Sequence, residues 1–216
     1  MPTILYTPTA RPVTMKDDVA VASSMRQLQS GIFSDARRAC HDSTANLAAL
    51  CDGGTLVIVA HSDAGQKIGA QGMPGLNEAQ LLQQLLDEGL PLDPSENIEI
   101  HLICSLSGAC VRRDYVWEHQ APFAERLAQE LARAEASRFL VHGYAGFLGE
   151  SAAYTQDLNT TDESKNIWRQ HAPRLQWQVE QGQWQRIGSE VWLQERAIKV
   201  ELRRKFSVHL TVRKAA

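Results

Sequence analysis

The chain has 216 residues, of which 44% are hydrophobic and 22% carry a charge. These proportions are ordinary for a globular protein, and the length suits one domain with or without a small appendage. The formal net charge of −3 argues against a general nucleic-acid binder, which would present an excess of Lys and Arg.

No apolar segment approaches the ~18 residues that a membrane span requires, and no apolar run follows a basic start as in a secretory signal. The four cysteines, Cys40, Cys51, Cys104 and Cys110, form no CxxC pair, so a reducing compartment is expected. We therefore expect a cytoplasmic protein, and export by a route without a signal peptide stays open. The histidines show no HExxH or comparable spacing, so we expect no catalytic metal.

Two elements are predicted ahead of the central part of the chain. Residues 3–7 form a short strand candidate that Pro8 and Pro12 interrupt. Because proline is disfavoured in a central strand, an edge strand or an ordered arm is expected. Ser34 is a suitable N-cap for a helix that extends to about residue 51. The apolar stripe of this helix consists of Ala36, Cys40, Leu47 and Cys51, and both cysteines are expected to be buried as small hydrophobic side chains.

Residues 55–104 predict a strand, a helix and a second strand. The first strand is apolar at every position from 56 to 60, which is typical of a strand covered on both faces in a parallel sheet. Asn77 caps a helix with apolar residues at helical spacing, and Gly89 ends it. Residues 98–103 form the next strand. This order predicts a βαβ unit whose two strands are parallel neighbours.

The remainder of the chain changes from α/β to antiparallel β character. A helix that starts near Pro122 and an apolar strand at 138–143 continue the core. The Gln181-Gly182 pair lies between two strand-like runs and predicts a hairpin over residues 176–187. Apolar residues at even positions between 198 and 212 predict further strand.

The expected fold is therefore an α/β three-layer sandwich with a mostly parallel central sheet and a C-terminal antiparallel β extension. We expect the core, with its N-terminal arm, to span residues 1–167. The extension spans residues 168–216 and packs on the core, so that the chain forms a single domain overall.

Each strand of the predicted βαβ unit ends at a residue with a reactive side chain. His61 follows the first strand and Cys104 follows the second. The C-terminal edge of an open α/β sheet is where ligands bind and chemistry occurs. A histidine beside a cysteine can take the thiol proton and leave a nucleophilic thiolate. The two strand ends therefore predict a cysteine nucleophile that a histidine activates.

These residues also carry a resemblance to a known family. The order of strand, His61, a loop of small residues, helix, strand and Cys104-Ser105-Leu106 resembles the caspase-like cysteine peptidases. Within this clan, the self-processing cysteine protease domains of large bacterial toxins are most similar in spacing and in having β structure after the core. The resemblance covers roughly residues 55–145.

The resemblance implies a caspase-like fold and a hydrolase of the thiol protease type, which cleaves polypeptides through a thioester and needs no cofactor for the chemistry. His61 would act as general acid and base, and Cys104 as nucleophile. Backbone N–H groups near Ser62 and Cys104 would hold the oxyanion. Asp63, two residues past His61, is a candidate for orienting the imidazole. A bacterial source and a role as an effector or toxin domain are also implied.

Two other interpretations stay open at the position after the histidine. The family usually has Gly there, whereas this chain has Ser62. The first interpretation is therefore a catalytically inactive interaction or anion-binding module on the same fold. Residues 60–64 also fit the small-x-nucleophile-x-small pattern of an α/β-hydrolase, which would make Ser62 the nucleophile of a serine hydrolase. No GxSxG motif is present, and a glycine-studded loop follows Ser62.

The C-terminal segment from residue 196 to 214 holds seven Lys or Arg and one acid, Glu201. One interpretation is a solvated strand face whose charges protect a sheet edge. The resemblance implies another, since inositol hexakisphosphate binds a basic pocket in the toxin protease domains and activates them. Several basic side chains can bind one polyphosphate together, and Arg203, Arg204 and Lys205 are the candidates. The expected partners are a polypeptide substrate and a polyanionic small-molecule effector, without nucleic acid.

Overall fold

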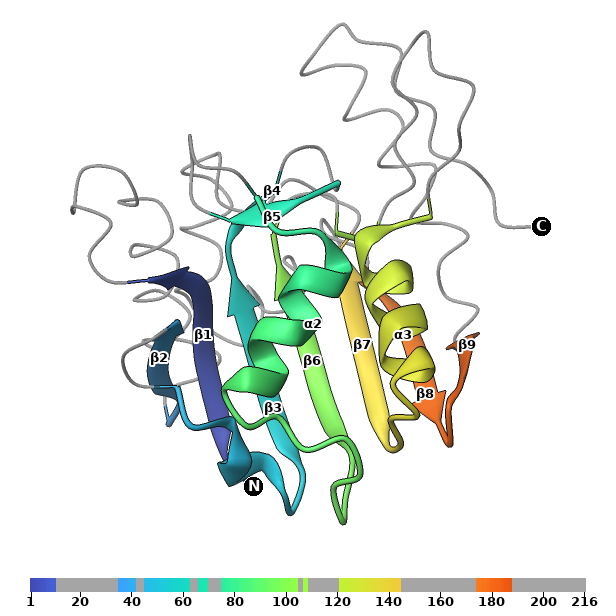
Figure 1. The fold of residues 1–216 in the computed structure, drawn as a ribbon, viewed down its shortest axis with the longest axis horizontal. Coiled ribbons are helices and arrows are strands. Elements are labelled where there is room, and N and C mark those ends of the chain that lie inside the picture. The colour runs from blue at the N-terminus through green and yellow to red at the C-terminus, as the bar shows by residue number, and fades with distance from the viewer. Residues whose placement is uncertain are drawn as a thin grey trace, which may run out of the picture.

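The computed structural model describes residues 1–10, 35–41, 45–62, 66–69, 75–104, 107–108, 121–144 and 174–187. Within these ranges the fold is α/β, with a seven-stranded sheet and a two-stranded one (Figure 1). The larger sheet has the order β2 (Arg37–His41), β1 (Thr3–Ala10), β3 (Gly54–Val59), β6 (Ile98–Ile103), β7 (Phe139–Tyr144), β8 (Arg174–Glu180) and β9 (Gln183–Ile187). The smaller sheet pairs β4 (His61–Ser62) with β5 (Ile68–Gly69).

The larger sheet is mostly parallel. The strands β2, β1, β3, β6 and β7 are all parallel to one another. β8 is antiparallel to β7, and β9 is antiparallel to β8. The predicted hairpin is confirmed, and its turn residues Gln181 and Gly182 have φ angles of 47° and 70°, as a tight two-residue hairpin turn requires. Because β8 pairs with β7, the hairpin continues the parallel sheet.

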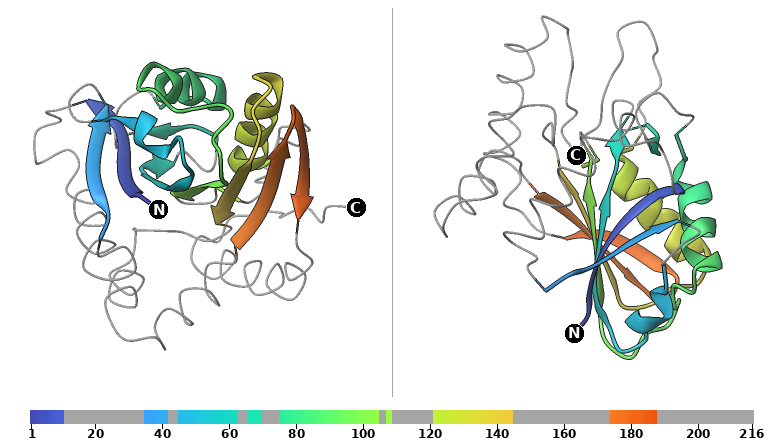
Figure 2. Two further views of the ribbon diagram at one scale, coloured as in Figure 1. Left: turned by 90° about the horizontal axis from the view of Figure 1, so that it is seen from below. Right: turned by 90° about the vertical axis from the view of Figure 1, so that its left-hand side faces the viewer.

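Two α-helices, α2 (Glu78–Asp87) and α3 (Phe123–Arg133), cover one face of this sheet (Figure 2). Along the chain, β3, β6 and β7 follow one another in the same direction across the sheet. Crossover connections that share one handedness then place both helices on the same face of the sheet. Asn77 begins α2 with a capping box, in which its side chain accepts a hydrogen bond from the Gln80 N–H. None of the helices in the described ranges combines the length and apolar character that crossing a membrane would demand.

Strand alternation divides the side chains between the two faces of the sheet. Leu56, Ile58, Ile100 and Leu102 belong to the core beneath the helices. The intervening apolar residues face the other side, and they too are buried: Leu5, Val57, Val59, Ile103 and Tyr144. Both faces of the parallel strands are therefore shielded from solvent, as their continuous apolar runs predict.

The N-terminal strand lies inside the sheet, so the prediction of an edge strand or arm is wrong. β1 lies between β2 and β3, and its pairing with β3 covers only Thr3 to Tyr6. Pro8 falls where the register with β2 shifts, between Thr7 and Ala10. An irregular stretch of ladder tolerates the missing N–H of proline, which explains how this strand can be internal.

The predicted helix over residues 36–51 is also wrong. The structure has β2 there, followed by a short 3-10 helix, η1 (Leu47–Leu50). Between residues 37 and 41 only Ala39 and Cys40 are apolar, and backbone pairing with β1 makes this stretch a strand. Cys40 is buried as predicted, but Cys51 is exposed.

Candidate active site

The ends of β3 and β6 bring the two predicted catalytic residues to one edge of the sheet. Val59 pairs with Ile103 in the parallel ladder. The Ala60 N–H then donates to the Ile103 carbonyl at 3.4 Å. Cys104 follows β6 directly, and His61 follows β3 after Ala60, so the predicted adjacency of the two strand ends is confirmed.

Cys104 continues the alternation of β6 and faces the helix-covered core. Its side chain is fully buried. Burial raises the pKa of the Cys104 thiol from 9.0 to about 12, and a hydrogen bond with the Ser107 side chain opposes only part of this rise. In this conformation the thiol therefore stays protonated at neutral pH.

Hydrogen bonds connect the turn after Cys104 to β7. The Ser107 hydroxyl donates to the Leu102 carbonyl at 2.8 Å and accepts from the Tyr144 N–H at 2.9 Å. The Gly108 N–H donates to the Tyr144 carbonyl at 2.9 Å. The Cys104 N–H, predicted as an oxyanion donor, donates to the Leu102 carbonyl at 2.9 Å. This group must release an internal partner before it can bind a substrate oxyanion.

His61 and Ser62 form the short strand β4, in which His61 pairs with Gly69 and Ser62 with Ile68. Both side chains are half-buried. An α/β-hydrolase nucleophile sits on a sharp turn from strand to helix, whereas Ser62 lies in an antiparallel strand pair. This local geometry does not favour Ser62 as the nucleophile of a serine hydrolase.

Several predicted site residues fall outside the described ranges. They are Asp63 beside His61 and the basic residues Arg203, Arg204 and Lys205. Of residues 105–120, which follow Cys104, the structure describes 107 and 108.

Comparison with models of known protein families and with curated proteins gives no match. The function proposed below therefore depends on the geometry of the sheet edge and on the resemblance in sequence.

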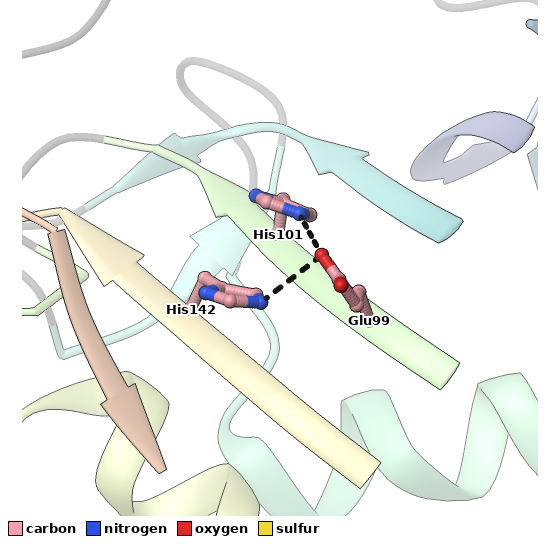
Figure 3. A group of neighbouring side chains, drawn as sticks. All are labelled: Glu99, His101 and His142. Atoms are coloured by element: carbon pink, nitrogen blue, oxygen red, sulfur yellow. Dashed lines mark hydrogen bonds and ion pairs between the residues drawn. The ribbon is translucent and has the colours of Figure 1, made fainter. Parts of the chain in front are cut away.

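A second group of chemically active side chains was not predicted from the sequence. Glu99, His101 and His142 converge on the sheet face opposite α2 and α3 (Figure 3). The Glu99-x-His101 spacing within a strand was the available signal, because residues two apart share one face. The contribution of His142 depends on the pairing of β6 with β7, which no local pattern reveals.

Proposed function

We propose that this chain is a cysteine peptidase of the caspase-like type whose nucleophile is latent in the conformation described here. The observation that carries the proposal is that His61 and Cys104 lie within two residues of the ends of two adjacent parallel strands, β3 and β6. The Ala60–Ile103 hydrogen bond joins these two strand ends. The order and spacing of these elements support the resemblance to the toxin protease domains.

In the proposed reaction, His61 accepts the proton of the Cys104 thiol, and the thiolate attacks the carbonyl carbon of a peptide bond. The protonated imidazole then donates that proton to the leaving amine, and a thioester remains on Cys104. A water molecule, deprotonated by His61, attacks the thioester and releases the carboxylic acid with the thiol restored. Backbone N–H groups hold the oxyanion in both steps.

Latency follows from the surroundings of Cys104. A pKa near 12 leaves about one thiol in 10⁵ ionised at pH 7, and a fully buried sulfur cannot meet a polypeptide. Activation therefore requires a movement that exposes the sulfur and frees the Cys104 N–H from the Leu102 carbonyl. Inositol hexakisphosphate, the activator that the resemblance implies, is the first effector to test.

The test is cleavage of a library of proteome-derived peptides, with and without inositol hexakisphosphate, read by mass spectrometry. Wild-type protein should produce new peptide ends that Cys104→Ala and His61→Ala do not produce. Cys51→Ala is the matched control, because this cysteine is exposed and precedes the start of β3, at the opposite end of the strand from His61; its cleavage products should equal those of the wild type. Identical products from wild type and Cys104→Ala in both conditions would overturn the proposal.

A catalytically inactive binding module on the same fold is the second candidate. The fully buried thiol and the internally bonded Cys104 N–H favour it. Iodoacetamide labelling at neutral pH separates the two functions. A peptidase should show faster labelling of Cys104 once its activator is present, and His61→Ala should remove this acceleration. Labelling of Cys104 that stays slow in all conditions supports the binding module.

A further inference from the structure

Three side chains with metal-binding atoms lie together on neighbouring strands. Glu99 and His101 are two residues apart on β6, so both project from the same face. His142 on β7 pairs directly with His101 in the parallel ladder. Figure 3 shows the carboxylate of Glu99 directed toward both imidazole rings.

The spacing of the three groups suits a metal ion. The Glu99 Oε2 atom lies 3.3 Å from His101 Nε2 and 3.5 Å from His142 Nε2. Two ligands at the usual zinc distance, arranged tetrahedrally, are about 3.3 Å apart. All three ligand atoms lie within 4.8 Å of one another. The imidazoles stack with centroids 4.2 Å apart and an interplanar angle of 13°, so metal binding would tilt the rings to bring their Nε2 atoms closer.

Each histidine has a second partner that fixes its ring. His101 Nδ1 lies 2.8 Å from the Tyr144 hydroxyl, and His142 Nδ1 lies 3.2 Å from the Gln176 side-chain amide. Outer partners of this kind are typical of metal-ligating histidines, because they orient the ring and leave the other nitrogen for the metal. A rotation of the Gln176 amide would let its carbonyl oxygen accept the Nδ1–H of a metal-bound His142.

The burial of the two histidines and the exposure of Glu99 both suit a metal site. His101 and His142 are 7% and 1% exposed, so the nitrogen ligands are held in place. The Glu99 side chain is 45% exposed, which gives an ion a route from solvent. A divalent ion would bind the two stacked, buried imidazoles and the carboxylate at once.

We propose that Glu99, His101 and His142 form a binding site for a divalent transition metal, with zinc as the leading candidate. Imidazole and carboxylate ligands together suit zinc, whereas calcium and magnesium prefer oxygen alone. Three protein ligands leave a coordination position for water or an added ligand, as in catalytic zinc sites. The proposal does not rest on the peptidase function, because Cys104 faces the opposite side of the sheet.

The test is calorimetric titration of the tag-free 216-residue chain with ZnCl₂, together with the visible absorption of its Co²⁺ complex. Wild type should bind one equivalent and give the intense absorption of tetrahedral cobalt. Glu99→Gln should bind at least about tenfold more weakly, and Tyr144→Phe about 10–100-fold more weakly through loss of the His101 support.

The matched control is Glu88→Gln. It removes the carboxylate from another histidine–glutamate pair, in which His41 Nδ1 lies 2.6 Å from Glu88 Oε1, and its zinc affinity should equal that of the wild type. Glu99 is half-exposed, so its Gln variant should fold, and its circular dichroism and melting temperature verify this. Failure of the wild type to bind zinc, or equal affinity in wild type, Glu99→Gln and Tyr144→Phe, would overturn the site.

Discussion

Raising the pH should destabilise this fold through ionisation of the buried thiol of Cys104. Burial raises its pKa in the folded protein to about 12, from 9.0 for an exposed cysteine. The folded state therefore holds the proton more tightly than the unfolded state. The stabilisation is complete below about pH 9 and is lost progressively as the pH rises from 9 toward 12.

The magnitude follows from these two pKa values. Each pH unit of difference corresponds to about 1.4 kcal/mol, so the separation between 9.0 and about 12 amounts to about 4 kcal/mol over the whole range. Relative to neutral pH, about 2 kcal/mol of unfolding free energy should be lost by about pH 10.5.

Urea unfolding of wild type and Cys104→Ala at about pH 7 and pH 10.5 measures this effect, because the titration of lysine and tyrosine side chains is common to both proteins. The difference in unfolding free energy between wild type and variant should shift by about 2 kcal/mol in favour of the variant at the higher pH. Cys51→Ala, at an exposed position, should show no such shift. A constant difference between wild type and Cys104→Ala would refute the raised pKa, and with it the proposed latency.

Four further substitutions test the fold by equilibrium unfolding. Asn77→Ala removes the capping box of α2 and should cost about 1 kcal/mol. Trp177→Ala should cost about 3–5 kcal/mol because this side chain is 1% exposed. Trp184→Ala, on the other strand of the same hairpin and 39% exposed, should cost less than about 1 kcal/mol; equal losses would contradict the difference in burial between the two tryptophans. Gly108→Ala would place its Cβ 2.6 Å from the backbone of Gly143, and a loss of about 1–3 kcal/mol is expected.

Local sequence predicted the secondary structure correctly where a pattern is compatible with only one type of element. The apolar runs before His61 and Cys104 became β3 and β6, and Asn77 became the N-cap of α2. The Gln181-Gly182 pair became the turn between β8 and β9. In each case backbone geometry or burial on both faces leaves a short segment little choice.

Local sequence failed where a neighbouring strand decided the outcome. Residues 37–41 contain too few apolar side chains to choose between helix and strand, and pairing with β1 made them β2. The irregular register around Pro8 let β1 lie inside the sheet although its prolines predicted an edge. Hydrogen bonds between segments distant in the sequence, and not local propensity, determined the structure at both places.

The same division applies to the two sites. The sequence alone determined that His61 and Cys104 follow two buried strands joined by one helix, since strand ends and crossover connections can be read from apolar runs and caps. Only the tertiary structure decided that Cys104 is buried in the core and that the pKa of its thiol is raised, because desolvation of the thiol depends on all the residues that pack around it. It also decided that His142 meets Glu99 and His101, because the register between two strands is set by the packing of the whole sheet.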